Sequence, residues 1–251
     1  MNTNDQTVLT ATVDNHATVT LNRPEARNAM SPELIDNLNA SLAELASVEE
    51  LRSLTILGAD PSFCAGMDLK AARDDPHAMR AALHGIATAM LAIRELKVPV
   101  IAQVQGAAIG GGCGLMTACD FVVSHPDAKL GYPEVDHGIC PAVVTPWLIR
   151  KIGAGRARAL LLSGGTVDGT RALEIGLVTH LVDREDLQAT VDELVQRISR
   201  GGAHALATTK KWINQIESSN LEAELRQGAD ISADVVAGPE AQERLARSRK
   251  R

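Results

Sequence analysis

The sequence predicts an α/β fold with a largely parallel sheet, followed by a C-terminal region made only of helices. Two observations predict it. Up to about residue 195, short β-branched and apolar runs alternate with longer stretches of helical periodicity, which is typical of βα units. After that point no strand signal remains, and the pair Gly201-Gly202 is the expected joint. We therefore expect a core over residues 1–195 and a helical region over residues 196–251, serving in oligomerisation or as a lid.

The first elements are a hairpin and a capped helix. Residues 7–13 and 17–22 alternate on either side of Asp14-Asn15-His16, which predicts two antiparallel strands. Ser31 is the expected N-cap of the next helix and Pro32 its first residue. Apolar residues then recur at helical spacing: Leu34, Ile35, Leu38, Leu42 and Leu45.

The remaining elements follow from the same patterns. In the first half we expect a buried strand at 51–58, a short helix from Asp68, a helix from Asp75-Pro76 to about Leu96, a buried strand at 98–104, a tightly packed helix after the glycine run, and strands at 120–124 and 128–131. In the second half we expect helices at 143–152, 156–162 and 170–175, a strand at 178–182, and helices at 184–199, 203–216, 221–234 and 239–248.

Composition limits the classes of function. Hydrophobic residues make up 45% of the 251 residues, so a sizeable core can form, but aromatic residues make up only 2%, which leaves few platforms for stacking bases. The net charge of −6 argues against a nucleic-acid or anionic-membrane partner. No run of 18 apolar residues occurs, and we expect a soluble, cytoplasmic protein. The cysteines form no C-x-x-C pair, which disfavours a zinc site and predicts reduced, mostly buried thiols: Cys64, Cys113, Cys119 and Cys140.

The stretch from Gln105 to Asp120 is the first candidate for chemistry. A buried strand, the three glycines 110–112 and a helix start follow one another, which would leave backbone N–H groups free to bind a negative charge. The run does not match a dinucleotide fingerprint, because Leu115 stands where the third glycine would be needed. The simple alternative is a helix packed closely on a strand.

Two further segments have the same character. Residues 62–70 again place a glycine turn after a strand, with free N–H groups expected around Met67, and the alternative is an ordinary capped turn. Because parallel strands end at one edge, both turns could meet at one oxygen. Glu134 lies among apolar neighbours, where a raised pKa would let it shuttle a proton, although the local sequence alone favours an exposed loop acid.

These segments together resemble the crotonase superfamily, the enoyl-CoA hydratases and isomerases. The matching blocks stand in family order and spacing: LNRPEARNAMS at 21–31, SFCAGMDLK at 62–70, the glycine run ending in ACD at 118–120, and GYPEVDHGICPA at 131–142, with ALATTKKWIN at 205–214 in the helical tail. The resemblance implies a spiral of ββα units with a helical C-terminal region. It also implies a homotrimer or dimer of trimers that acts on acyl-CoA thioesters.

The resemblance assigns roles to particular residues. The amides of Met67 and Gly111 would hold the thioester oxygen while an enolate forms, and Glu134 would move the proton. The strip Met67-Asp68-Leu69-Lys70 would contact CoA, with Lys70 near its phosphates or adenine. Ala26 and Ala65 match positions that line the CoA channel. The resemblance implies no metal and no cofactor beyond the CoA of the substrate.

The sequence departs from the hydratase pattern at one decisive position. Hydratases of this family use two glutamates, and Gly114 stands where the first is expected. A single carboxylate suffices to move a proton between two carbons, so enoyl-CoA isomerisation is the leading expectation. Hydration, in the manner of methylglutaconyl-CoA hydratase-like members, acyl-CoA cleavage by a lyase, and CoA binding without catalysis remain alternatives. Met67 should narrow the pocket, and Ala142 disfavours dehalogenation because that branch has a nucleophilic aspartate there.

A few polar and aromatic residues are secondary candidates. His137 could shuttle protons or merely hydrogen-bond, and His84 could reach the acyl pocket. Asp120 is expected to satisfy backbone groups, and Trp147 to lie in the core or an interface. Lys210, Lys211 and Trp212 could reach a neighbouring subunit's CoA, but a solvated helix face is the default.

Overall fold

A six-stranded sheet forms the base of the molecule, and the helices cover both of its faces. The computed structural model describes residues 6–69, 75–217 and 220–248. The sheet has the order β1-β2-β3-β4-β6-β9, with β1 and β2 antiparallel and every later pair parallel. Its strands are β1 (Val8–Val13), β2 (His16–Leu21), β3 (Ser53–Gly58), β4 (Val100–Val104), β6 (Phe121–Ser124) and β9 (His180–Leu181).

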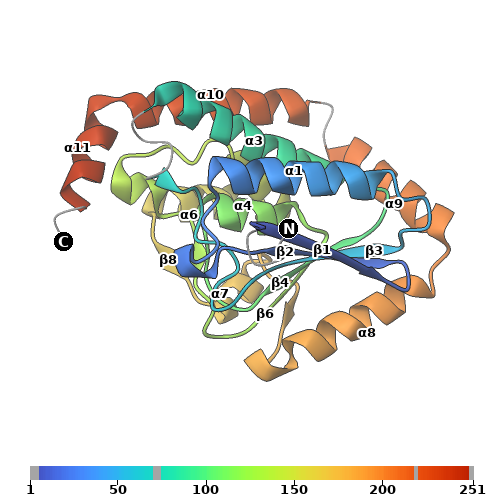
Figure 1. Ribbon diagram of the computed structural model, residues 1–251. Coiled ribbons are helices and arrows are strands. Elements are labelled where there is room, and N and C mark those ends of the chain that lie inside the picture. Colours follow the sequence, from blue (N-terminus) through green and yellow to red (C-terminus); the bar gives the residue numbers. More distant parts are fainter. Residues whose placement is uncertain (1–5, 70–74, 218–219, 249–251) are drawn as a thin grey trace.

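The helices form layers on both faces of the sheet, and the sheet separates two hydrophobic clusters. Figure 1 shows α1 (Pro32–Ala46), α3 (Pro76–Glu95) and α10 (Leu221–Ala237) above the sheet and α8 (Leu187–Ser199) below it. Because side chains alternate along a strand, Ile101 of β4 packs toward α8, whereas Val100 and Ala102 join the main core. The other helices are α4 (Gly111–Ala118), α5 (Thr145–Ile152), α6 (Ala154–Ser163), α7 (Gly169–Glu174), α9 (Ala203–Glu217) and α11 (Pro239–Ser248).

The capping signals act as predicted. Ser31 Oγ accepts a hydrogen bond from the Leu34 amide, and Pro32 opens α1. The predicted stripe of α1 is fully buried. Asp75 caps α3 through the His77 amide at 2.8 Å. Asp14 and Asn15 both have positive φ, which is the geometry of a tight two-residue hairpin turn.

A second, three-stranded sheet was not predicted as such. It consists of β5 (Ala108–Ile109), β7 (Leu130–Gly131) and β8 (Thr166–Val167), in the order β5-β7-β8. Strands of two residues carry no periodicity, so β5 and β8 escaped detection. Because β5 lies between β4 and α4, the glycine helix follows the small sheet and not the large one.

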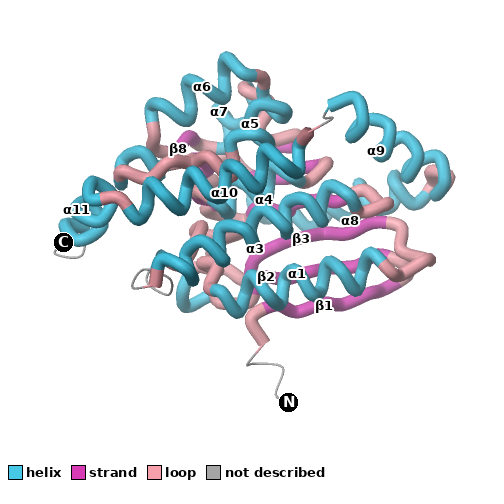
Figure 2. Tube along the Cα trace, turned by 90° about the horizontal axis from the view of Figure 1, so that it is seen from above, coloured by secondary structure: helices cyan, strands magenta, loops and turns pink. Residues whose placement is uncertain are grey.

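Three short 3₁₀ helices complete the described elements: η2 (Pro24–Ala26), η3 (Pro133–His137) and η4 (Arg184–Asp186). The helix expected from residue 184 therefore begins as η4 and becomes α8. Helices follow residue 195 as predicted. The predicted boundary at 195/196 falls inside α8, however, whereas the Gly201-Gly202 pair lies between α8 and α9. Within the part of the chain that is described, no helix is both long and apolar enough to pass through a bilayer. Figure 2 shows α9 projecting beside the sheet, apart from α10 and α11.

Candidate active site

The two glycine turns lie side by side. A short parallel bridge joins them, in which the Cys64 amide donates to Ala107 O and the Ile109 amide donates to Cys64 O, both at 3.0 Å. Gly66 has φ +91°, and a Cβ there would stand 2.7 Å from Ile109 O and 3.8 Å from the Gly111 amide nitrogen. Glycine is therefore required at 66 for the two turns to approach this closely.

Each turn presents one uncommitted amide. Met30 N donates to Gly66 O and Asp68 N donates to Met30 O, which leaves the Met67 amide between them without an acceptor among the described residues. Gly111 opens α4, and its amide likewise donates to no described residue, as expected for the first turn of a helix. Both residues line the same cavity. Two backbone N–H groups without a described acceptor therefore belong to residues that line one cavity, as a site for an anionic oxygen requires.

Glu134 reaches this cavity from η3. The turn begins directly after β7 and ends at Gly138, which adopts the left-handed conformation. Tyr132 anchors its start and is fully buried. The Oε2 atom of Glu134 is buried and has no hydrogen-bond partner among the described residues.

The environment of Glu134 changes its acidity. Burial raises its pKa from 4.5 to about 7, although a hydrogen bond from its own backbone amide opposes the shift. Removal from water disfavours the charged form of a carboxyl, so Glu134 exchanges a proton near neutral pH.

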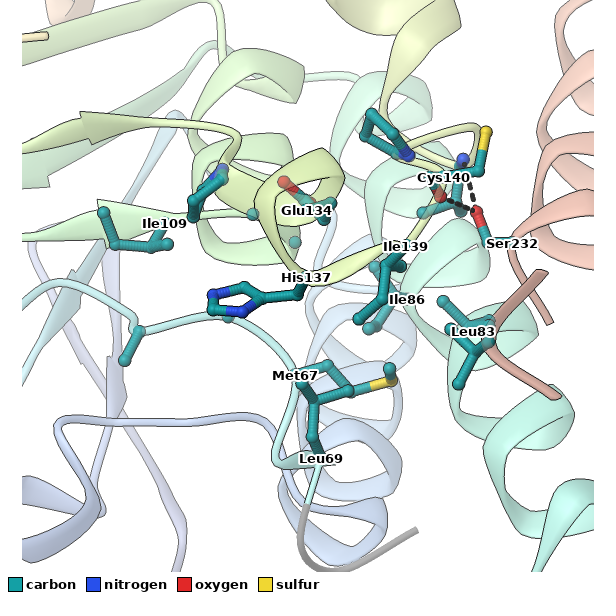
Figure 3. Close-up of a pocket in the computed structure, with 18 residues that line it drawn as sticks. Met67, Leu69, Leu83, Ile86, Ile109, Glu134, His137, Ile139, Cys140 and Ser232 are labelled. Atoms are coloured by element: carbon teal, nitrogen blue, oxygen red, sulfur yellow. Dashed lines mark hydrogen bonds between the residues drawn. The ribbon is translucent and has the colours of Figure 1, made fainter. Parts of the chain in front are cut away.

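The cavity has a volume of about 180 Å³ and is largely apolar (Figure 3). Met67, Ile109 and Ala65 line it on the side of the glycine turns, and Glu134 and His137 reach it from η3. Its apolar wall is formed by Leu69, Leu83, Ile86, Ile139, Val143 and Val236. An apolar wall with a few polar groups is typical of a pocket for a small molecule, and this wall suits an acyl chain.

The other residues predicted to contact CoA are spread around this cavity. Ala65 lines it, and the Ala65 amide donates to Arg27 O, which places Ala26 one residue from that contact. Asp68 pairs with Arg23 at 3.2 Å. Helical structure begins at Leu69 rather than Asp68. Lys70 lies outside the described residues.

The secondary candidates separate into two groups. His137 lines the cavity, whereas His84 bonds Asp230 at 2.9 Å and is not one of the described lining residues. Asp120 accepts from the Val100 amide, as expected of a structural residue.

The environment of Lys210 differs from the predicted solvated helix face. Its side chain is buried and lies 2.7 Å from Asp120, so the expected solvated face of α9 is wrong at this position. Trp147 is buried in the core, and Arg94 lies 5.6 Å from its ring centre. Trp212 is 62% exposed.

Gly114, at the position of the missing acid, is buried in α4. A Cβ there would stand 2.5 Å from Val144 Cγ1 and 3.1 Å from Met90 Sδ. The space that a side chain would need is filled by apolar groups. The sequence showed that the glutamate is absent, but not that its place is occupied.

Comparison with known proteins identifies the family of the chain. The family model "Enoyl-CoA hydratase/isomerase" matches residues 12–249. The Bacillus subtilis protein YngF, which carries the same hydratase/isomerase name, is 36% identical over 232 residues, covering 90% of this chain and 87% of its own. A short-chain-enoyl-CoA hydratase from Clostridium acetobutylicum is 32% identical, covering 79% of this chain and 77% of its own.

Solved structures show the same fold. An enoyl-CoA hydratase from Mycobacterium avium has a TM-score of 0.88 and 32% identity, covering 98% of both chains. An enoyl-CoA hydratase from Bacillus halodurans has a TM-score of 0.89 and 25% identity, covering 96% of this chain and 99% of its own. The spiral crotonase fold with a helical C-terminal region is therefore the fold of this protein, and the chain belongs to the enoyl-CoA hydratase/isomerase family of acyl-CoA enzymes.

Proposed function

We propose that the protein is an enoyl-CoA isomerase that moves a double bond with Glu134 as its single acid–base residue. One observation carries the proposal: Glu134 is a partly buried carboxyl of raised pKa that lines the same cavity as the two free amides, while the position of a second carboxyl is a packed glycine. The relatives' names include both hydratases and a fungal isomerase/hydratase from Mycosarcoma maydis that is 34% identical.

The proposed reaction begins with a 3-enoyl-CoA in the cavity. The amides of Met67 and Gly111 donate to the thioester oxygen. The ionised Glu134 takes a proton from C2, and the electron pair of the broken C–H bond forms a dienolate whose charge rests on that oxygen. Glu134 then returns the proton to C4, so the double bond lies between C2 and C3. Each preorganised donor to such an oxyanion typically contributes about 3 kcal/mol to the lowering of the barrier.

The proposed binding mode uses the strip beside Met67. Asp68 and Leu69 follow the oxyanion donor, and Ala26 and Ala65 border the path by which CoA would enter. Met67 and Leu69 line the cavity with their side chains and favour a compact, apolar acyl group. No cofactor other than the substrate's own CoA is proposed.

The proposed assembly is a homotrimer or a dimer of trimers. Helix α9 exposes an apolar patch that a second subunit could cover, formed by Trp212, Ile213 and Ile216, which are 62%, 45% and 67% exposed. Sedimentation analysis distinguishes these assemblies from a monomer.

Replacing Glu134 with Gln tests the proposal. Gln has a similar shape but cannot carry the proton, so isomerisation of trans-3-hexenoyl-CoA should fall by at least about 10²-fold, the usual contribution of a general acid–base group. Calorimetry with hexanoyl-CoA should show unchanged binding. Undiminished turnover by Glu134→Gln would remove Glu134 from the mechanism, and CoA-ester binding by a wild type without turnover would favour a non-catalytic member.

Hydration is the second candidate, because most of the relatives are named as hydratases. Mass spectrometry of the products of trans-2-hexenoyl-CoA and trans-3-hexenoyl-CoA separates the candidates, since hydration adds one water and isomerisation leaves the mass unchanged. The same screen detects cleavage by a lyase as two smaller products.

A further inference from the structure

A second proton-handling group faces the cavity from the same turn as Glu134. His137 ends η3, and Glu134 stands three residues before it. In a 3₁₀ helix, residues three apart lie one above the other on the same face. Both residues line the cavity, and Figure 3 shows their side chains leaving the same turn. The geometry of η3 therefore presents a carboxyl and an imidazole together.

The remaining charged groups near η3 point elsewhere. Asp136 accepts a hydrogen bond from the Gly165 amide at 2.9 Å, which turns its carboxyl to the loop before β8. Arg244 of α11 donates to the backbone oxygen of Asp136 at 3.4 Å. No hydrogen bond or ion pair ties the His137 side chain to another described residue, so its ring is available to a ligand in the cavity.

We propose that His137 supplies the second acid–base function that Gly114 cannot, so that the His137–Glu134 pair gives the site a hydratase activity alongside isomerisation. The inference rests on the proposed acyl-CoA chemistry of this cavity. It assigns the pair to hydration and Glu134 alone to isomerisation. Imidazole is well suited to accept a proton from water near neutral pH.

The proposed hydration adds one water molecule across the double bond of a 2-enoyl-CoA. A water molecule bound by neutral His137 forms a bond from its oxygen to C3 of a 2-enoyl-CoA, and His137 takes one of the water's protons. The C2–C3 π pair becomes the enolate held by the Met67 and Gly111 amides. Protonated Glu134 gives its proton to C2, which yields the 3-hydroxyacyl-CoA. The imidazolium then returns a proton to the Glu134 carboxylate, directly or through water, and both groups regain their starting state.

The test separates the two activities in the full-length protein. For wild type and His137→Gln, kcat and KM are measured for hydration of trans-2-hexenoyl-CoA and isomerisation of trans-3-hexenoyl-CoA. We expect His137→Gln to lower kcat for hydration by at least about 100-fold while isomerisation changes less than about threefold. His84→Gln is the matched control, because His84 is hydrogen-bonded to Asp230 and is not among the described residues that line the cavity. This substitution should leave both rates unchanged.

Three results would overturn the inference and leave isomerisation standing: a wild type that isomerises but does not hydrate, unchanged hydration in His137→Gln, or an equal loss of both activities through KM. The last would make His137 a binding residue only. A wild type that converts neither ester overturns the proposed function itself, and this inference with it.

Discussion

The carboxyl of Glu134 fits against the backbone of Gly110, where a side chain would collide with it. A Cβ built at Gly110 lies 2.9 Å from Oε1 of Glu134. Gly110 also has φ +54° and ψ −123°, a conformation that other residues rarely adopt. Gly110 is thus the N-cap of α4, the helix that carries one proposed oxyanion donor. The same glycine leaves the space that the carboxyl of Glu134, the proposed proton carrier, occupies.

Replacing Gly110 with Ala should therefore damage catalysis more than folding. The new methyl group displaces the Glu134 carboxyl, and the strained φ shifts the Gly111 amide, so kcat/KM for isomerisation should fall by about 10²-fold, the usual effect of losing one oxyanion donor. Steady-state kinetics measures the loss.

Gly155→Ala is the matched control for this substitution. Gly155 lies in α6, and nothing stands within 4 Å of the Cβ it would gain. The control should retain full activity. Equal activity of Gly110→Ala and wild type would show that the carboxyl is not held at this glycine.

The pH dependence of isomerisation should report the environment of Glu134. In the proposed isomerisation Glu134 acts as a base, so it must be ionised, and burial raises its pKa from 4.5 to about 7. The value of kcat/KM should rise with pH and level off above about pH 8, with an apparent pKa near 7. A profile already flat at pH 5 would contradict a buried Glu134 as the base.

The ionisation of Glu134 should also affect the stability of the fold, which should fall as pH rises, whereas the isomerisation rate should rise. The folded state holds the proton of Glu134 more tightly than the unfolded chain does, so the contribution of this group is greatest at low pH and is lost as pH rises from about 4.5 through 7. Glu134→Gln removes this dependence. Relative to wild type, its free energy of unfolding should gain about 2–3 kcal/mol between pH 4 and pH 8. Urea titrations at both pH values measure the difference, and parallel stability curves for the two proteins would contradict it.

Much of this architecture is predictable because its signals are local. Ser31 and Asp75 cap helices in the structure as the sequence indicates, and Leu34 and its helical repeat are buried. The hairpin turn at Asp14-Asn15 follows from residues that tolerate positive φ. Each of these features depends on neighbours in sequence, and periodicity or turn chemistry encodes them.

The site was only partly predictable, since its parts meet through long-range contacts. The glycine turns at 66 and 110–112 were visible as motifs, but their adjacency depends on the bridge between Cys64 and Ala108 and on the two-residue strand β5. The pocket-facing orientation of His137 depends on η3, which the sequence suggested only as a loop. The packing of Val144 onto Gly114 joins two elements that no local pattern relates.

Lys210 also depends on a long-range contact that the sequence does not reveal. A charged residue on a helix is expected to be exposed unless a buried partner is known. The Lys210 ammonium lies 2.7 Å from Asp120 Oδ2 and 2.9 Å from Val98 O, beneath α9. Replacing Lys210 with Met should destabilise the fold by about 2–3 kcal/mol, since Asp120 keeps a largely buried charge without its cation. Thermal and urea unfolding measure the loss.

The neighbouring lysine provides the control for this prediction. Lys211 is exposed on the same helix, so Lys211→Met should change stability by less than about 0.5 kcal/mol. Similar losses in the two variants would mean that α9 is held by its general packing rather than by the Lys210–Asp120 pair.

The packing around Gly114 determines whether a glutamate can be introduced at the position of the missing second carboxylate. The Cβ of any side chain at 114 would press on Val144 Cγ1 at 2.5 Å, so Gly114→Ala should cost about 1–3 kcal/mol of stability. Val144→Ala removes the colliding methyl group, and the double variant should be less destabilised than the sum of the single variants.

Gly114→Glu alone should then unfold more readily without gaining hydration, whereas Gly114→Glu combined with Val144→Ala has room for the new side chain. Unfolding and hydration rates of these variants form one experiment. Full stability and faster hydration in the Gly114→Glu single variant would show that α4 moves aside easily, and that the apolar packing around Gly114 does not keep a second acid out of this site.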